Sequence, residues 1–237
     1  MISNSCPASA VIKFLSRLGG DQISNGLKGF ALPALLALAL PCALQARTIA
    51  LKAEDIDRVA AITEQGPRYS WAAYEGTVGM FRNAPQFCTP QSGFLIHYPL
   101  DKIPKGQHIS LAELTIPVAL VSPPQARLYF WRILVDWGVG VCNQFRMIRP
   151  TKEAWTVPGA RGNSTDRATK PSTVIGVPEV GEKSVNLTQD VELWYTGAAP
   201  NHGWLISVED KDTAIQLQSP IYDGTASWEL RITYEPQ

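Results

Sequence analysis

The residues that could carry out chemistry are few and widely spaced. The three histidines, His97, His108 and His202, lie far apart, and no two of them have the spacing of a metal-binding pair. The sequence contains no G-x-S-x-G elbow, no H-E-x-x-H and no phosphate-binding loop. These observations favour a protein that is not an enzyme. A polysaccharide-active enzyme stays open as a third interpretation, because catalytic carboxylate pairs are defined in space.

Two groups of side chains suit a sugar ligand. Tyr69, Trp71 and Tyr74 lie close together in an irregular stretch, where exposed rings can stack on a pyranose. The alternative for these three is packing of the loop against the domain. Arg161 and Arg167 follow a turn, and from the rim of a loop they would face an acidic sugar.

Two other motifs are typical of structural turns. In the first, Trp155 is expected beneath a loop, Pro158 and Gly159 form a turn, and Asp166 accepts hydrogen bonds from loop amides. In the second, the residues from Asn201 to Gly203 form a tight turn into a strand, with ligand binding or proton transfer by His202 as the alternative.

The acidic run from Glu209 to Asp212 is predicted to be a solvated turn. Its alternative is a calcium site at Asp210 and Asp212, since calcium prefers oxygen ligands. No other metal or cofactor is expected. Lysine plus arginine and aspartate plus glutamate both number 21, so the chain lacks the basic excess of a nucleic-acid-binding protein.

Residues 1–46 resemble a secretory signal peptide. Basic residues precede an apolar run from Phe30 to Leu40, and Ala46 provides a small residue before the expected cleavage point. The run is shorter than a membrane-spanning helix, although an uncleaved anchor is the alternative. We therefore expect a secreted or cell-surface protein that has no membrane contact after cleavage. The exported chain would retain Cys88 and Cys142, which predict either a disulfide or two buried thiols.

Residues 47–237 are predicted to form one all-β domain, an antiparallel sandwich or jelly roll. Alternation of apolar and polar residues is clearest from Ser227 to Tyr234. The other expected strands are Thr48–Lys52, Phe94–Tyr98, Ser110–Val121, Arg127–Val135, Thr173–Val177, Lys183–Leu187, Gly203–Val208 and Ala214–Leu217. Helical turns are expected at Thr188–Tyr195, with Thr188 as the cap and Gly197 as the stop, and at Glu54–Glu64.

Three stretches together resemble the DNRLRE domain family, which is related to jelly-roll carbohydrate-binding modules. The first runs from Gly93 to Leu114, and the second is the W-x-x-P-G-A-x-G loop that begins at Trp155. The third contains Asp190 and Trp194, followed by Asn201 and Gly203, and the closing strand also matches. The resemblance covers roughly residues 48–236, with a longer and less regular stretch than the family pattern at residues 64–91.

The resemblance implies a β-sandwich that binds, or is associated with, carbohydrate. We therefore expect a non-catalytic module whose partner is a polysaccharide or surface glycan. The alternative function is that of an extracellular structural or adhesion protein, which would use its strand edges or loops for self-association.

Overall fold

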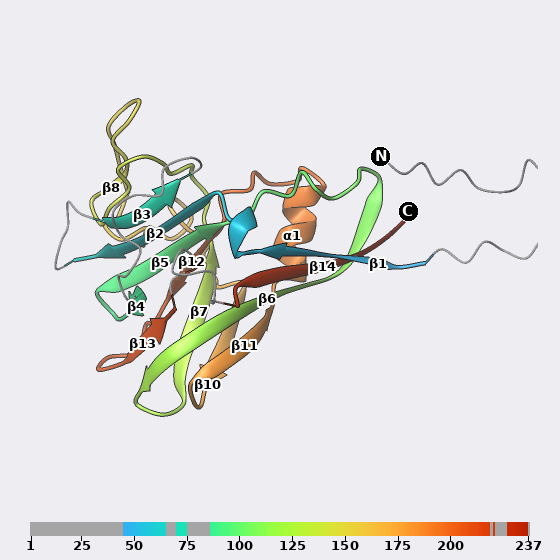
Figure 1. Cartoon of the computed structure of the whole chain (residues 1–237). Helices are drawn as coiled ribbons and strands as arrows, with labels where there is room; N and C mark the ends of the chain where they lie inside the picture. Colours follow the sequence, from blue (N-terminus) through green and yellow to red (C-terminus); the bar gives the residue numbers. More distant parts are fainter. Residues whose placement is uncertain (1–44, 65–69, 75–85, 219, 221–226, 237) are drawn as a thin grey trace, which may run out of the picture. The chain divides into compact units, whose positions relative to one another are not determined.

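Two antiparallel sheets make up the sandwich, as predicted (Figure 1). The computed structural model describes residues 45–64, 70–74, 86–218, 220 and 227–236, and at 70–74, 86 and 87 it describes only the backbone. Within this part, sheet A comprises β1 (Arg47–Lys52), β14 (Glu229–Pro236), β6 (Gln107–Ser122), β13 (Ala214–Leu217) and β4 (Gln86–Cys88), with β11 (Gly181–Asn186) also paired to β6. Sheet B comprises, in order, β10 (Thr173–Val177), β7 (Ala126–Arg132), β12 (Trp204–Ser207), β5 (Ser92–His97), β2 (Arg58–Thr63) and β3 (Ser70–Tyr74).

The main core lies between the two sheets, because each strand alternates its side chains between two faces. In β14, Leu230, Ile232 and Tyr234 are buried while Arg231 is exposed, which confirms the predicted alternation. Phe94 of β5 meets Trp228 from the opposite sheet with ring centroids 5.3 Å apart. These large rings pack among the aliphatic side chains of the main core.

A long segment covers the outer face of sheet B and creates a second core. We call residues 133–172, which connect β7 to β10, the cover segment; they contain the short strands β8 (Phe145–Met147) and β9 (Glu153–Ala154). Side chains of sheet B that point away from the main core, such as Leu95 and Leu205, pack against Trp137 and Trp155 of this segment. The central strands β5 and β12 and most of β2 are therefore buried on both faces of sheet B.

The helical turn predicted within Glu54–Glu64 is present only at the start of that stretch. It is the 3-10 turn η2 (Ala53–Asp55), and from Arg58 onward the chain forms strand β2. Val59 points into the main core, whereas Ala60 and Ile62 belong to the second core. Such a strand has a nearly continuous apolar sequence, which periodicity alone does not distinguish from a buried helix.

The predicted helix is confirmed as α1 (Thr188–Tyr195), and it ends at Gly197, which has φ of +74°. The predicted cap was wrong. The hydroxyl oxygen of Thr188 accepts a hydrogen bond from the backbone of Ala112 at 2.8 Å, and it is the amide of Thr188 that donates to Asn186. Among the described residues, no helix is long and apolar enough to span a membrane.

Candidate functional site

The described polar residues with the richest contacts form a network at one end of the outer face of sheet B. Arg58 of β2 and His97 of β5 are paired across the two strands. Their neighbours Val59 and Ile96 point into the main core, so Arg58 and His97 point to the opposite face. The network therefore lies where the cover segment begins.

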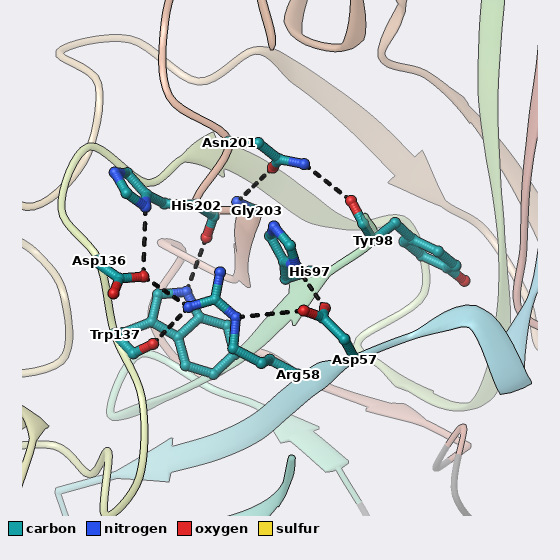
Figure 2. A network of polar contacts seen from close by, with 9 residues as sticks. All are labelled: Asp57, Arg58, His97, Tyr98, Asp136, Trp137, Asn201, His202 and Gly203. Carbon is teal, nitrogen blue, oxygen red and sulfur yellow. Dashed lines mark hydrogen bonds and ion pairs between the residues drawn. The ribbon is translucent and has the colours of Figure 1, made fainter. Parts of the chain in front are cut away.

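Arg58 lies between two carboxylates (Figure 2). Its Nη1 donates to Asp136 Oδ1 at 2.7 Å and to the backbone oxygen of Trp137 at 2.6 Å. Its Nε lies 3.8 Å from Asp57 Oδ2, and Asp57 also contacts His97 Nδ1. One guanidinium thus joins strand β2 to the first residues of the cover segment.

Trp137 strengthens the same attachment. Its ring is fully buried and lies 5.0 Å from the guanidinium carbon of Arg58, a cation–π contact. Its indole nitrogen donates to the backbone oxygen of His202 at 2.8 Å. Strands β2 and β12 therefore both hold this tryptophan, the first through Arg58 and the second through the turn that precedes it.

The turn into β12 has the tight geometry that the sequence predicted. The Gly203 amide donates to Asn201 Oδ1 at 3.1 Å, and Asn201 Nδ2 donates to the Tyr98 backbone oxygen at 2.9 Å. Gly203 has φ of +75°, and a Cβ there would lie 2.1 Å from the Ile96 oxygen. Only glycine fits at this position.

Burial and charge act in opposite directions on the two ionisable groups next to Arg58. Burial alone would raise the pKa of Asp136, but the hydrogen bond from Arg58 and the nearby positive charges hold that pKa below its usual value. Burial lowers the pKa of His202, and Arg58 and His97 lower it further against the opposing pull of Asp136. The neutral form of His202 is therefore favoured.

These groups resemble the parts of a proton-transfer site, since each of two histidines lies beside a carboxylate. However, Arg58 is already engaged by the protein's own acceptors, and His97 is only 7% exposed. Within the described ranges, no three histidine, cysteine or acidic side chains come together in a way that could hold a metal ion. The geometry suits the attachment of a loop better than catalysis.

A second feature, an open depression of about 290 Å³, lies in the cover segment itself. It is lined by Gln144, Phe145, Ile148 and Lys152. Lys152 Nζ lies 4.3 Å from the centre of the Phe145 ring, so a cation stands beside an aromatic face. An amide, a cation and an apolar surface therefore converge in one open depression.

The cover segment also carries cations without a carboxylate partner. Arg146 pairs with Glu153, but Arg149, Lys152, Arg161 and Lys170 form no ion pair with any described residue. The backbone amide of Gly159 donates to the Asn143 backbone oxygen at 2.7 Å. A Cβ at Gly159 would lie 3.2 Å from both Arg161 Nε and Asn143 Nδ2. Arg161 therefore lies beside the residue that precedes Gln144.

The predicted sugar-binding residues are only partly described. Tyr69 lies outside the described residues, and for Trp71 and Tyr74 the structure describes the backbone in β3 but not the side chains. Arg161 is half-buried. Arg167 differs from the expectation of a loop rim: it is 6% exposed, lies 3.7 Å from the Trp131 ring, and donates to Glu209 at 2.9 Å.

The predicted structural motifs behave as expected. Trp155 is buried and donates to the Cys142 oxygen at 2.9 Å, while Gly159, the residue after Pro158, has φ of +79°. The Asp166 carboxylate accepts three backbone hydrogen bonds of 2.8–2.9 Å, from Thr156, Val157 and Gly162.

Helix α1 is held by the other two motif residues. The buried Asp190 accepts a 2.7 Å hydrogen bond from the Trp204 indole, and the Trp194 ring packs on the same indole with centroids 4.5 Å apart. These contacts join α1 to the central strand β12 of sheet B.

The predicted disulfide is absent, because Cys88 and Cys142 are both free and buried. Cys88 lies in the main core, where burial raises the pKa of its thiol to about 12. Cys142 lies in the cover segment, where its backbone oxygen is bonded to Trp155. Sheet B separates these two environments, so the second of the two predicted alternatives, a pair of buried thiols, is the one observed.

The acidic run at residues 209–212 contains occupied carboxylates. Arg127 forms two hydrogen bonds with Asp210, at 2.7 and 3.1 Å, and this pairing outweighs a small burial effect to lower the pKa of Asp210. Glu209 accepts from Arg167. Both carboxylates thus already bind cationic side chains, and the calcium alternative stays an untested prediction.

Sequence reasoning missed Arg58, Asp136 and Trp137, and it considered His97 and His202 only singly. The one available signal was an isolated arginine at the start of an otherwise apolar run. No family model matches this chain, and no curated protein matches it either. What the fold defines is an antiparallel β-sandwich with one outer face covered by a long connection.

Proposed function

We propose that this chain is an exported, non-catalytic module that binds an acidic polysaccharide through the depression in its cover segment. The observation that carries the proposal is the placement of Lys152 beside the Phe145 ring in that depression, with Gln144 at its wall. The ring offers a stacking surface for a pyranose, and the ammonium group offers a partner for a sugar carboxylate. The expected signal peptide and the family resemblance support the same function.

The unpaired cations of the cover segment favour an acidic ligand over a neutral one. Arg149 and Lys152 are both exposed and have no carboxylate partner among the described residues. Removal of residues 1–46 would leave a chain with two more acidic than basic residues, so this local excess of positive charge is not a property of the whole surface. Local positive charge on an acidic protein directs anionic ligands to that face.

Binding of Lys152→Ala and Phe145→Ala to polygalacturonate and to its fully methyl-esterified form would test this proposal. We expect each variant to bind polygalacturonate at least about tenfold more weakly, because Lys152→Ala removes a charge-assisted hydrogen bond of about 1.5–3 kcal/mol. Phe145→Ala removes the stacking surface. The esterified polymer should bind weakly to all forms of the protein. Isothermal titration calorimetry would measure these affinities.

Lys105→Ala is the matched control, since Lys105 is an exposed lysine outside the cover segment. It should bind as the unaltered protein does. If the unaltered protein bound neither polymer, or if Lys152→Ala and Lys105→Ala bound equally well, the proposed site would be refuted.

One observation favours the alternative of a structural or adhesion protein. Strand β10 pairs only with β7 among the described strands, and Val174 on it is 40% exposed. An open edge can add a strand from another molecule. Concentration-dependent sedimentation that a Val174→Lys substitution abolishes would support self-association through this edge.

A further inference from the structure

Arg58 attaches the first part of the cover segment to sheet B. It belongs to a small charged cluster with Asp57, His97, Asp136 and His202. Asp136 and Trp137 follow Ile133, whose amide donates to the Gly203 oxygen at 3.0 Å, and Arg58 donates to both of them. Backbone hydrogen bonds then join this start to the strand that lines the depression: the Gly138 amide donates to Arg146, and the Ile148 amide donates to Val139. A change at Arg58 is therefore transmitted to the wall of the depression.

His202 is the member of the cluster with the least satisfied side chain. Its Nδ1 is buried and forms no hydrogen bond with any described residue. The nearest carboxylate oxygen, Oδ1 of Asp136, is 3.5 Å away and already accepts from Arg58. A proton on this ring would be attracted by that carboxylate and repelled by Arg58 and His97, while burial disfavours its charge.

The groups that face His202 come from three neighbouring elements. Arg58 approaches from β2, His97 from β5 and Asp136 from the cover segment, while Asp57 contacts His97. When His97 and His202 are both neutral, Arg58 is the cation that faces the carboxylates of Asp57 and Asp136. Protonation of His202 adds a second cation that competes with Arg58 for the same oxygen of Asp136.

We propose that His202 is an acid-sensitive latch, whose protonation weakens the hold of Arg58 on Asp136 and Trp137 and loosens the start of the cover segment. The latch is closed while the ring is neutral, because Arg58 is then the cation paired with the Asp136 carboxylate, while Arg146 donates to the Asp136 backbone oxygen at 2.5 Å. When the ring is charged, that carboxylate is shared and the half-buried guanidinium of Arg58 is left with a like charge nearby.

The direction of the pH effect follows from the two shifted groups. The pKa of His202 is lowered in the folded protein, so its contribution to stability is present above the ordinary histidine pKa of about 6.5 and is lost as the pH falls below that value. The pKa of Asp136 is also lowered, so this carboxylate keeps its charge until the pH falls below its ordinary value of 3.8. A change between pH 7.5 and 5 would therefore report on histidine.

Hydrogen exchange of residues 134–148, read by mass spectrometry, tests the latch in the full chain. At each pH the exchange rate of the folded protein is divided by that of the unfolded chain. This ratio removes the intrinsic pH dependence of amide hydrogen exchange. We expect protection of this segment to fall about fivefold to tenfold between pH 7.5 and 5.0, while residues 107–118 in β6 keep theirs. In His202→Gln the fall should disappear.

His108→Gln is the control, because His108 is exposed and lies between Glu192 and Glu235, away from the cluster. It should retain the full effect. Asp136→Asn gives a second measurement that does not depend on the histidine variant: it should lower protection of residues 134–148 already at pH 7.5. An equal fall in His202→Gln, or none in the unaltered chain, would overturn the proposal.

If the proposed function is correct, protonation of His202 would also lower the affinity of the depression for the glycan; this extension rests on the proposed function. Affinity for polygalacturonate should fall at pH 5.0 in the unaltered chain more than in His202→Gln. The exchange experiment needs no ligand, so the two hypotheses can fail separately. Absence of glycan binding would leave the latch intact, and absence of the exchange effect would leave the depression as a site without pH control.

Discussion

At the scale of single residues, the firmest requirement in the molecule is at Gly203. Its positive φ and the closeness of the Ile96 oxygen follow from the way the turn enters β12 beside β5. The sequence motif predicted a tight turn here, because asparagine and glycine favour such geometry. It did not predict Arg58 as the centre of a network, since the partners of that arginine lie far along the chain and are brought to it by folding.

Replacement of Gly203 by alanine should lower the free energy of unfolding by more than about 2 kcal/mol, because the new Cβ meets backbone as well as an unfavourable φ. Gly106→Ala separates the two causes: Gly106 has φ of +74° but open space around it, so it should cost only about 1–2 kcal/mol. Urea denaturation would measure both. Equal costs for the two substitutions would show that the clash with Ile96 is relieved.

At the scale of elements, most strands of the sandwich were predictable, including β5 and β12, which are buried on both faces, and β14, which alternates cleanly. Strand β2 was not, because both of its faces are apolar and its stretch predicted helical turns instead. In the cover segment the sequence predicts only the loop that begins at Trp155, and nothing local in the segment indicates that it packs on sheet B. Its tryptophans, Trp137 and Trp155, could be assigned to burial but not to a particular partner surface.

The cover segment should open without unfolding of the sandwich, because loop contacts and only one short two-stranded sheet join it internally. The two buried thiols report on this difference. We expect Cys142 to react with a thiol reagent at least about tenfold faster than Cys88 under native conditions, measured by mass spectrometry of the labelled peptides. Trp137→Phe should increase the labelling rate of Cys142 and leave that of Cys88 unchanged. An equal increase in both labelling rates would indicate global unfolding instead.

At the scale of the whole molecule, the described fold begins where the predicted signal peptide ends. Strand β1 starts at Arg47, the residue after the expected cleavage point at Ala46, and it pairs with β14 along its full length. Cleavage there would remove the leader without shortening sheet A. The general class, an all-β antiparallel sandwich, was predictable from many short alternating strands, while the depression was not, because it depends on side chains brought together by the folding of the cover segment.

The mass of the exported protein checks this boundary. We expect an N-terminus at Arg47, since a cut farther along the chain would remove pairing with β14. N-terminal sequencing after export would identify it. A mature end within β1, or a chain that retains its full mass, would contradict the predicted signal peptide.

The position of β14 between β1 and β6 has a consequence for the order of folding. Residues 229–236 are synthesised after nearly all of the other described strands, yet β1 has no other described partner in sheet A. The sheet therefore cannot close around a nascent chain, and its earliest strand has to wait for its latest one.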